Sequence, residues 1–343
     1  MRHAWANVAL LALVAIAVAT GLGGLLISDR DGAVVFWLHG VAAWAIAGLL
    51  VVKGRVIVAA IRRRPAVTVS RAAFLLLLAL LLAVLASGAA WVLLDGYRRL
   101  GYFSLINVHA YLAIALALLL AWHVAARRRV FRAAGARDRA AFLRYGGAAL
   151  LGLALWRAER LVEAAIGPEG RRRFTGSYER GSHSPDFPRV RWLLDDPDPV
   201  DAAAWRLTVD GAVRTPLELD AATLAALPAA QRRAILDCTG GWWCEQDWVG
   251  VDLRELLARA GPTDAARSVR VVSTTGYDRR FALDVAGGLL LATAVAHAPL
   301  THGHGAPLRL VAPGRRGFEW VKWVERIEVL ESSHRWQSPL PLQ

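Results

Sequence analysis

The stretch LDCTGGWWCEQDWVGVDLREL, residues 236–256, contains the two cysteines of the 343-residue chain, Cys238 and Cys244. Cys238 follows RAILD, a run typical of a β-strand, and begins the glycine-rich turn TGGWW, where the backbone can approach a bound group closely. Two cysteines at this spacing have four alternative interpretations: a short disulfide, a metal site, a nucleophilic centre, or one metal ligand beside a structural cysteine. A thiolate in this turn is a soft ligand for a metal that has few other protein donors.

The chain around this stretch has the pattern of a mixed α+β domain. Short strand-like runs alternate with helical stretches such as AATLAALPAA and LRELLARA. This alternation favours an α+β domain over residues 168–343 rather than a nucleotide-binding βαβ fold. The sequence contains no GxGxxG or Walker-type loop and suggests no Ser-His-Asp constellation, and His302 and His304 lack the partners of a zinc site.

Several blocks in a fixed order then carry a family resemblance. They are FTGSYERGS, WRLTVDGAVRTPLEL, the Cys238 segment ending in DWVGVDLREL, STTGYD and HGAPLRLVAPGRRGFEWVKWVERIEV. Residues from about 174 to 331 thereby resemble the sulfite-oxidase family of molybdenum-cofactor domains. In that family one cysteine at a strand end ligates molybdenum, and a pyranopterin dithiolene supplies two further sulfurs.

The resemblance implies roles for individual residues. Cys238 takes the position of the molybdenum ligand and is the first expected catalytic residue. Tyr277 is the second expected catalytic residue, placed on the substrate side of the site. Arg309 matches the family's cofactor arginine, whose forked guanidinium suits a terminal phosphate. The other expected molybdopterin-binding residues are Tyr178, Glu179, Thr275, His304 and Lys322, the last with the backbone around Trp320 and Val321.

The second cysteine has no counterpart that the metal needs. We interpret Cys244 as a buried small residue, because a free cysteine behaves mainly as a small apolar group. A Cys238–Cys244 disulfide would close a very short loop rich in tryptophan. The tryptophans at 242, 243 and 248 are expected to pack the domain or to form walls of its pocket. The sequence therefore predicts one metal ligand and one structural cysteine.

The residues before about 156 have the composition of a membrane domain. Hydrophobic residues make up 56% of the chain, and four apolar segments at residues 8–27, 34–57, 73–94 and 105–125 each have about the 20 residues that a membrane-spanning helix needs. Much of the net charge of +13 lies in arginine clusters at residues 53–65 and 126–139. Such clusters mark cytoplasmic loops, so the basic charge indicates membrane topology rather than nucleic-acid binding.

Four histidines sort by depth within these segments. His39 and His109 lie near the outer ends of the second and fourth segments, and His3 and His123 lie near inner ends. His109 and His123 are close to four helical turns apart, about 21 Å along one helix face. Histidines inside a span are usually functional, although interfacial histidines near helix ends are the alternative. The depths predict an outer haem between His39 and His109 and an inner haem between His3 and His123.

Residues 1–129 also resemble the four-helix di-haem cytochrome b family of bacterial membranes, which has one histidine each on helices one and two and two on helix four. A fifth segment, residues 142–161, has a short apolar run followed by charges. Its leader, DRAAFLRYGG, resembles a twin-arginine export signal in which Ala140 replaces the second arginine. We expect this segment to cross the membrane and to place the following domain outside. An interfacial segment with a cytoplasmic domain is the alternative.

The expected protein is multi-domain: an all-α transmembrane bundle (1–129), a basic linker with a fifth membrane helix (130–167) and a sulfite-oxidase-like α+β molybdopterin domain (168–343). It is expected in the bacterial inner membrane, with the catalytic domain periplasmic. The resemblance implies oxygen-atom transfer on a small oxyanion or oxide, and electron exchange with quinone through two b-type haems. The sequence leaves the direction of reaction open. The alternative is a non-catalytic haem electron-transfer protein with a degenerate outer binding domain.

Overall fold

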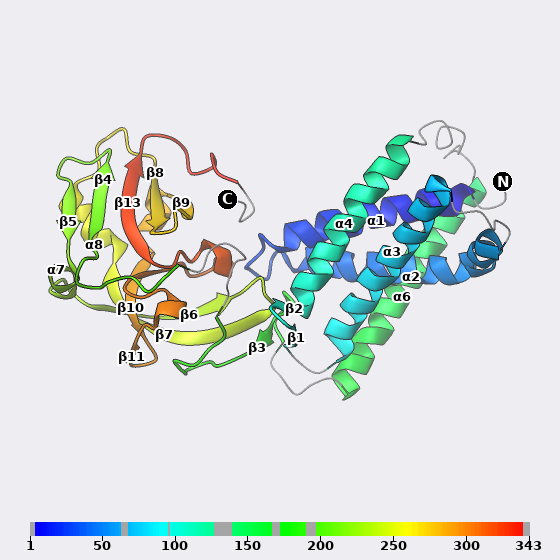
Figure 1. Ribbon diagram of the computed structural model, residues 1–343, viewed down its shortest axis with the longest axis horizontal. Coiled ribbons are helices and arrows are strands. Elements are labelled where there is room, and N and C mark those ends of the chain that lie inside the picture. Colours follow the sequence, from blue (N-terminus) through cyan, green and yellow to red (C-terminus); the bar gives the residue numbers. More distant parts are fainter. Residues whose placement is uncertain are drawn as a thin grey trace. The chain divides into compact units, whose positions relative to one another are not determined.

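A computed structural model describes residues 4–62, 68–94, 97–126, 139–166, 172–189 and 197–338. The chain divides into two compact units, Met1–Gly176 and Ser177–Gln343 (Figure 1). The first is helical and the second combines sheets with short helices. The multi-domain prediction, with apolar helices followed by an α+β domain, is confirmed at this level.

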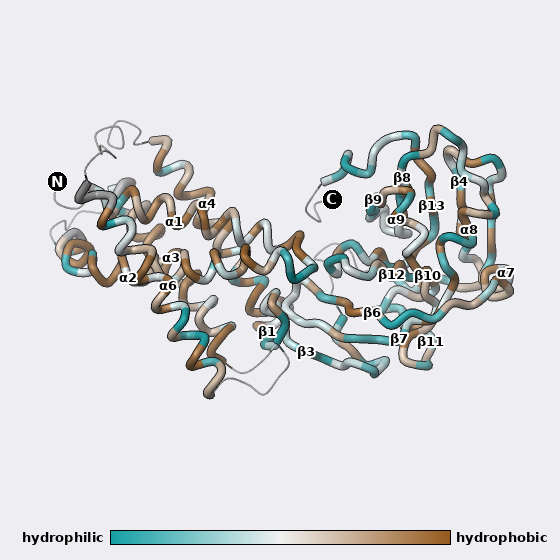
Figure 2. The backbone as a smooth tube through the Cα atoms, turned by 180° about the vertical axis from the view of Figure 1, so that it is seen from behind, coloured by the Kyte–Doolittle hydropathy of each residue, from teal (hydrophilic) through white to brown (hydrophobic). Residues whose placement is uncertain are grey.

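The helical unit contains four helices that are long and apolar enough to cross a membrane. The qualifying spans are Trp5–Gly24, Ala33–Ala59, Arg71–Leu93 and Leu105–Ala126. They lie in α1 (Ala4–Gly24), α2 (Ala33–Arg62), α3 (Val69–Leu93) and α4 (Leu105–Ala126), and a short hairpin of β1 (Arg99–Leu100) and β2 (Phe103–Ser104) precedes α4. Figure 2 shows their largely hydrophobic colouring, and outward leucines such as Leu118, 69% exposed, suit a lipid environment.

A further helix, α6 (Arg139–Ile166), packs closely along α2. A Cβ atom at Gly152 would lie 2.6 Å from the Val41 carbonyl oxygen, so glycine is what permits this approach. The contacts continue from Ala148, which packs with Leu49, to Trp156, whose ring lies 6.5 Å from that of Trp37. α6 therefore runs antiparallel to α2. Its charged second half keeps it out of the four spans that qualify by composition.

The second unit contains two sheets in the described part of the chain (Figure 1). In the first sheet, β7 (Trp242–Asp252) pairs with three strands. β6 (Ala230–Asp237) and β10 (Leu290–Val295) are antiparallel to it, and the short β3 (Tyr178–Glu179) is parallel. β10 also pairs with β11 (Ala298–Pro299) and β12 (Arg309–Val311). A Cβ atom at Gly250 would lie 1.9 Å from the Leu291 carbonyl oxygen, so only glycine fits where β7 meets β10.

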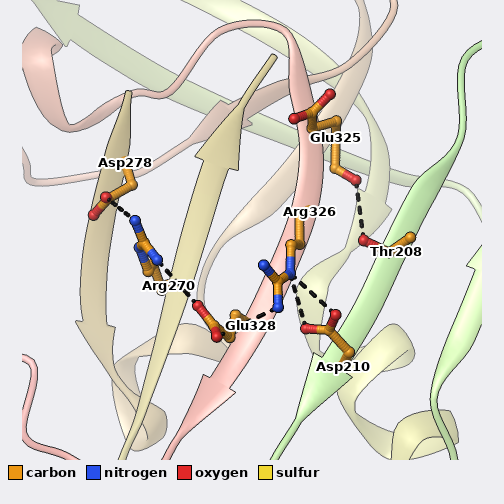
Figure 3. A network of polar contacts seen from close by, with 7 residues as sticks. All are labelled: Thr208, Asp210, Arg270, Asp278, Glu325, Arg326 and Glu328. Carbon is orange, nitrogen blue, oxygen red and sulfur yellow. Dashed lines mark hydrogen bonds and ion pairs between the residues drawn. The ribbon is translucent and has the colours of Figure 1, made fainter. Parts of the chain in front are cut away.

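The second sheet has the order β5-β4-β13-β8-β9 and mixes parallel and antiparallel pairs. Its strands are β4 (Leu207–Gly211), β5 (Leu217–Leu219), β8 (Ser268–Ser273), β9 (Asp278–Ala282) and β13 (Val324–Leu330). Charged side chains cross-link it: Arg326 Nε lies 3.0 Å from an Asp210 oxygen, and Arg270 bonds both Asp278 and Glu328 (Figure 3). These partly exposed pairs connect four of the five strands.

Short helices join the strands. α8 (Leu253–Ala260) buries Leu253, Leu256 and Leu257 on one face, as its apolar spacing predicts. It ends at Gly261, whose φ of 62° is left-handed and whose N–H donates to the Leu257 carbonyl. The remaining helical elements are α7 (Ala221–Ala225), α9 (Leu283–Ala286) and the 3-10 turns η1 (His302–His304) and η2 (Gly317–Glu319).

Candidate functional sites

A pocket opens at the end of β6 in the second unit. It contains about 640 Å³ of empty space, part of it open to solvent. Five of the residues predicted for the site line it together: Cys238, Tyr277, His304, Arg309 and Lys322. The fold thus brings to one cavity residues that lie far apart in the sequence.

Cys238 is held in the turn between β6 and β7. Its N–H donates to the Trp242 carbonyl at 2.9 Å, and its carbonyl accepts from the Gly241 N–H at 3.0 Å. Gly241 has a φ of 90°, which favours glycine. The Gly240 N–H lies 3.2 Å from the Cys238 sulfur. Burial raises the pKa of the Cys238 thiol to about 11, so a bound cation is needed to favour the thiolate at neutral pH.

Arg309 supplies a buried cation to the same pocket. Arg309 is the first residue of β12, and only 5% of it is exposed. Its Nη1 donates to the His304 carbonyl at 2.9 Å. The guanidinium lies 5.4 Å from the Trp248 ring centre and 5.9 Å from that of Trp320. Among the described residues, no acceptor bonds its Nε and no carboxylate pairs with it. Burial lowers the pKa of Arg309 to about 10.

Further positive charge lines the pocket. Lys322 Nζ lies 3.7 Å from the ring centre of Trp323, and the exposed Arg189 lies at the pocket wall near Gly303. No carboxylate belongs to the described lining. A cavity that gathers Arg189, Arg309 and Lys322 without a carboxylate is suited to an anionic group, because a buried charge is costly until it is paired.

His304 forms a wall beside these cations. Its ring stacks on Phe187 with centres 3.8 Å apart, and its Nε2 lies 2.9 Å from the Phe187 carbonyl oxygen. Its Nδ1 lies 3.0 Å from the Thr301 hydroxyl. Burial, followed by the charges of Arg309, Arg189 and Lys322, lowers the pKa of His304 to about 4, so the ring is neutral at physiological pH. Both ring nitrogens are engaged by the protein.

Tyr277 lines the pocket with its hydroxyl already in use. The Oη donates to the Phe318 carbonyl at 2.5 Å and accepts from Arg279 Nε at 2.8 Å. The buried Arg279 guanidinium also lies 4.9 Å from the Phe318 ring centre. This arrangement fixes the phenol at the pocket wall.

Three other predicted cofactor residues lie beside the pocket and do not line it. Tyr178 and Glu179 form β3 and pair with Trp242 and Trp243 of β7. Glu179 accepts from the Ser182 N–H at 2.8 Å. The Thr275 hydroxyl donates to Ser273 Oγ at 3.2 Å. Trp242 and Ser273 do line the pocket, so Tyr178 and Thr275 each contact a lining residue. The partners of Glu179, Trp243 and Ser182, lie outside the lining.

The structure adds an ion pair that the sequence reasoning missed, and it shows Trp242, one of the three tryptophans expected to pack the domain or to form pocket walls, in the pocket lining. The Asp237 carboxylate lies 2.7 Å from Arg316 Nη1, and both side chains are almost fully buried directly behind Cys238. Trp242 lines the pocket, and its Nε1–H has no acceptor within the described structure. Asp237 and Trp242 adjoin the quoted cysteine turn, but one sequence gives no sign that Arg316 reaches it.

Cys238 and Cys244 are both free and buried, so the structure contains no disulfide between them. Cys244 lies in β7 opposite Leu236 of β6, and burial raises the pKa of its thiol to about 12. It does not line the pocket.

Two of the predicted haem histidines meet inside the helical unit. The ring centres of His39 on α2 and His109 on α4 are 6.1 Å apart, with planes inclined at 77°. A metal about 2 Å from one nitrogen of each ring, on opposite sides, would place the ring centres about 6 Å apart. His39 Nδ1 lies 2.9 Å from the Ala17 carbonyl oxygen and His109 Nδ1 lies 3.0 Å from that of Val84. Because a carbonyl only accepts, each Nδ1 carries the proton and each Nε2 keeps a lone pair.

Matching groups surround the two rings. On α1, Thr20 Oγ1 lies 3.3 Å from His39 Nδ1, and a Cβ atom at Gly21 would lie 3.2 Å from His39 Cε1. On α3, Ser87 Oγ lies 3.2 Å from His109 Nδ1, and a Cβ atom at Gly88 would lie 3.1 Å from His109 Cε1. Carbonyl, hydroxyl and glycine follow the same spacing on both helices. The predicted inner partner of His123, His3, lies outside the described residues.

Comparison with known proteins identifies the second unit. The profile described as oxidoreductase molybdopterin binding domain matches residues 194–337. The chain is 31% identical over 143 residues to the uncharacterized oxidoreductase YuiH of Bacillus subtilis (strain 168), covering 72% of that protein and 41% of this chain. The chain belongs to the molybdopterin-binding oxidoreductase family. The resemblance and the oxidoreductase class predicted from the Cys238 and Arg309 blocks are thereby confirmed.

Other proteins are also similar to parts of the chain. The protein-methionine-sulfoxide reductase catalytic subunit MsrP of Burkholderia mallei is 29% identical, over 46% of this chain and 51% of that protein. The MsrP of Xanthomonas campestris pv. campestris is 32% identical, over 40% of this chain and 50% of that protein. The chain therefore spans about half the length of these relatives. The sulfane dehydrogenase SoxCD structure from Paracoccus pantotrophus is 27% identical with a TM-score of 0.38, covering 39% of this chain and 40% of that one.

Proposed function

We propose that this chain is a membrane-anchored oxidoreductase that holds a molybdenum–molybdopterin cofactor in the pocket at the end of β6. Cys238 would ligate the metal, and Arg309, with Lys322, would bind the anionic end of the pterin. One observation carries the proposal: Cys238 shares its pocket with a buried arginine that has an unpartnered Nε–H and no carboxylate among the described residues. A thiol and a phosphate-sized anion site together suit this cofactor.

Bound molybdenum supplies two-electron oxygen-atom transfer, while the protein binds, orients and shields the reacting groups. Phe187, Trp242 and Trp320 contribute aromatic surface to the pocket lining, which would limit the access of water to a bound cofactor. Tyr277, the second proposed catalytic residue, is held rigidly by Arg279 and the Phe318 carbonyl and faces the same space. Tyr178 and Thr275 would support the cofactor through the lining residues Trp242 and Ser273 that they contact. Glu179 would act by bracing the neighbouring 178–182 segment, where it accepts from the Ser182 N–H.

We favour a sulfoxide as substrate and reduction as the direction. The support is that several relatives of the matched region are named protein-methionine-sulfoxide reductase catalytic subunits. A small oxyanion such as sulfite, oxidised rather than reduced, would use the same pocket and is the competing outcome of a substrate screen.

The helical unit would carry electrons between a membrane quinone and the molybdenum site. We propose that His39 and His109 ligate an outer b-type haem, supported by their 6.1 Å ring separation and by the two carbonyls that leave both Nε2 atoms available. His123 and His3 would ligate an inner haem. A haem in this position supplies single-electron transfer.

We propose further that α6 is a fifth crossing, within a linker of residues 130–167 between a haem domain of residues 1–129 and an enzyme domain of residues 168–343. α6 has 28 residues, which is about 42 Å of helix. Its Tyr145 contacts Trp5 at the start of α1, and its Trp156 lies beside Trp37 near the start of α2. With five crossings and cytoplasmic arginine clusters, the enzyme domain would lie in the periplasm.

One purification tests the core of this proposal. Full-length protein in detergent should contain molybdenum and pterin in equal amounts, and reduced quinol should support turnover of a methionine sulfoxide. Protein with haem but without molybdenum or pterin, after expression with ample molybdate, would establish the non-catalytic electron-transfer alternative. Molybdenum-containing protein that oxidises sulfite and leaves sulfoxides unchanged would reverse the assigned direction.

A further inference from the structure

A buried ion pair lies directly behind the proposed metal ligand. Arg316 Nη1 and Asp237 Oδ1 are 2.7 Å apart, and their side chains are 4% and 3% exposed. Asp237 is the last residue of β6, so its backbone continues into Cys238. The Ser177 hydroxyl donates to the same carboxylate oxygen at 2.8 Å. Two polar side chains from distant segments therefore hold the residue that precedes the thiol.

The backbones on the two sides of this pair are also close. Asp237 and Arg316 form a parallel β-bridge. The following residue, Gly317, lies so near the thiol residue that a Cβ atom there would be 3.1 Å from Cys238 Cα and 3.3 Å from the Asp237 carbonyl oxygen. Gly317 and Cys238 both line the pocket. The ion pair thus closes a contact between the cysteine turn and the 315–322 segment, which also supplies Lys322.

Stability alone does not account for such a pair. Removing two charges from water is costly, and a buried ion pair replaced by uncharged side chains of similar volume often leaves a protein as stable or makes it more stable. Removal of one partner is destabilising, because the other charge stays buried without compensation. A role in fixing local geometry explains the ion pair better, because groups that contact a metal ligand from behind commonly orient that ligand.

We propose that Asp237 and Arg316, with Ser177, are positioning residues that fix the Cys238 turn against the 315–317 segment, so that the sulfur is oriented before the metal binds. The inference rests on the proposed molybdenum site for its purpose. The fixing of the turn is a property of the protein alone and is measurable without the cofactor.

The test compares three variants of the full-length protein in detergent, produced with and without molybdate. Asp237→Asn removes the negative charge beside Arg316, Arg316→Met removes the positive charge beside Asp237, and the double variant removes both charges. Both singles should lower the melting temperature, and the double variant should recover much of that loss. The control, Asp210→Asn with Arg326→Met, removes a partly exposed Asp–Arg pair of the second sheet whose residues do not line the pocket.

Hydrogen exchange in the molybdenum-free protein then decides the role. In the double variant we expect faster exchange of the Cys238 and Gly241 amides, whose bonds close the turn, while the central β7 amides stay protected. In molybdenum-loaded protein we expect an altered Mo(V) EPR signal and a loss of about 10- to 100-fold in metal retention or turnover. The control pair should change neither.

Two results would overturn the positioning role. One is wild-type exchange in the turn and a wild-type EPR signal once the double variant has regained its stability. The other is faster exchange spread evenly over β6 and β7, which indicates general loosening. A wild-type protein that contains no molybdenum would instead remove the proposed function, and the exchange in the turn would still decide whether the pair fixes it.

Discussion

Replacement of Arg309 by methionine should affect the empty and the loaded protein in opposite directions. Burial lowers the pKa of Arg309 from 12.5 to about 10 in the folded protein. At about 1.4 kcal/mol for each tenfold change in proton affinity, keeping this arginine charged costs the fold about 3 kcal/mol. Because the pKa of a base is lowered, this cost is present at every pH below about 10 and falls only as the pH rises towards 12.5.

Favourable contacts offset part of the cost. The bond from Nη1 to the His304 carbonyl and the stacking near Trp248 and Trp320 together contribute about 2 kcal/mol. Methionine keeps much of the side-chain volume and carries no charge. The cofactor-free Arg309→Met protein should therefore be as stable as the parent or about 1 kcal/mol more stable, a rise of roughly 2–4 °C in melting temperature for a domain of this size.

The loaded protein should show the reverse. Each charged hydrogen bond from Arg309 to a phosphate contributes about 1.5–3 kcal/mol, so its loss should weaken pterin retention about 10- to 150-fold. Thermal unfolding followed by near-ultraviolet circular dichroism measures the first effect, and pterin content after dialysis measures the second. Arg326→Met, on the second sheet, is the control. A lower melting temperature in cofactor-free Arg309→Met, with normal pterin retention, would show that Arg309 is a structural cation and refute the reasoning.

Three further outcomes test the sites and the topology. Cys238→Ser should lower turnover by orders of magnitude and change the molybdenum spectrum, whereas Cys244→Ser should cost only modest stability; equal effects of the two would contradict the ligand assignment. His109→Ala should remove the outer haem from the optical spectrum, and His123→Ala should remove only the inner one; loss of both haems in each variant would refute the pairing by depth. A periplasm-specific reporter fused after Gln343 should be active, and a cytoplasmic signal would count against the crossing by α6.

The sequence predicted those parts of the fold in which local composition decides the structure. The four apolar segments correspond to α1, α2, α3 and α4, because the length of an apolar run and the need to satisfy backbone groups in lipid both favour a helix. α2 continues to Arg62, beyond the expected end at residue 57, because a helix does not stop where its side chains become polar. The cofactor blocks likewise predicted a set of residues, five of which line one pocket.

Contacts between distant residues were beyond this reasoning. Asp237 is visible beside Cys238, but its partner Arg316 comes from another block, and no periodicity in one sequence connects them. The matching surroundings of His39 and His109 were missed for the same reason: Thr20 and Ser87 are ordinary small polar residues until the helices that carry them are packed. Tyr277 was predicted from the family resemblance, and only the structure reveals that Arg279 and Phe318 occupy its hydroxyl.

The two matching histidine environments have a consequence for how the helical unit assembles. The pair α1 and α2 supplies one histidine with its carbonyl and glycine, and the pair α3 and α4 supplies the other. Neither helical hairpin contains both proposed axial ligands of the outer haem. The haem could therefore be ligated on both faces only after the hairpins have docked. The proposed haem would thus join the two hairpins as a disulfide joins two strands. The optical spectrum of that haem would then report on docking of the hairpins, independently of electron transfer.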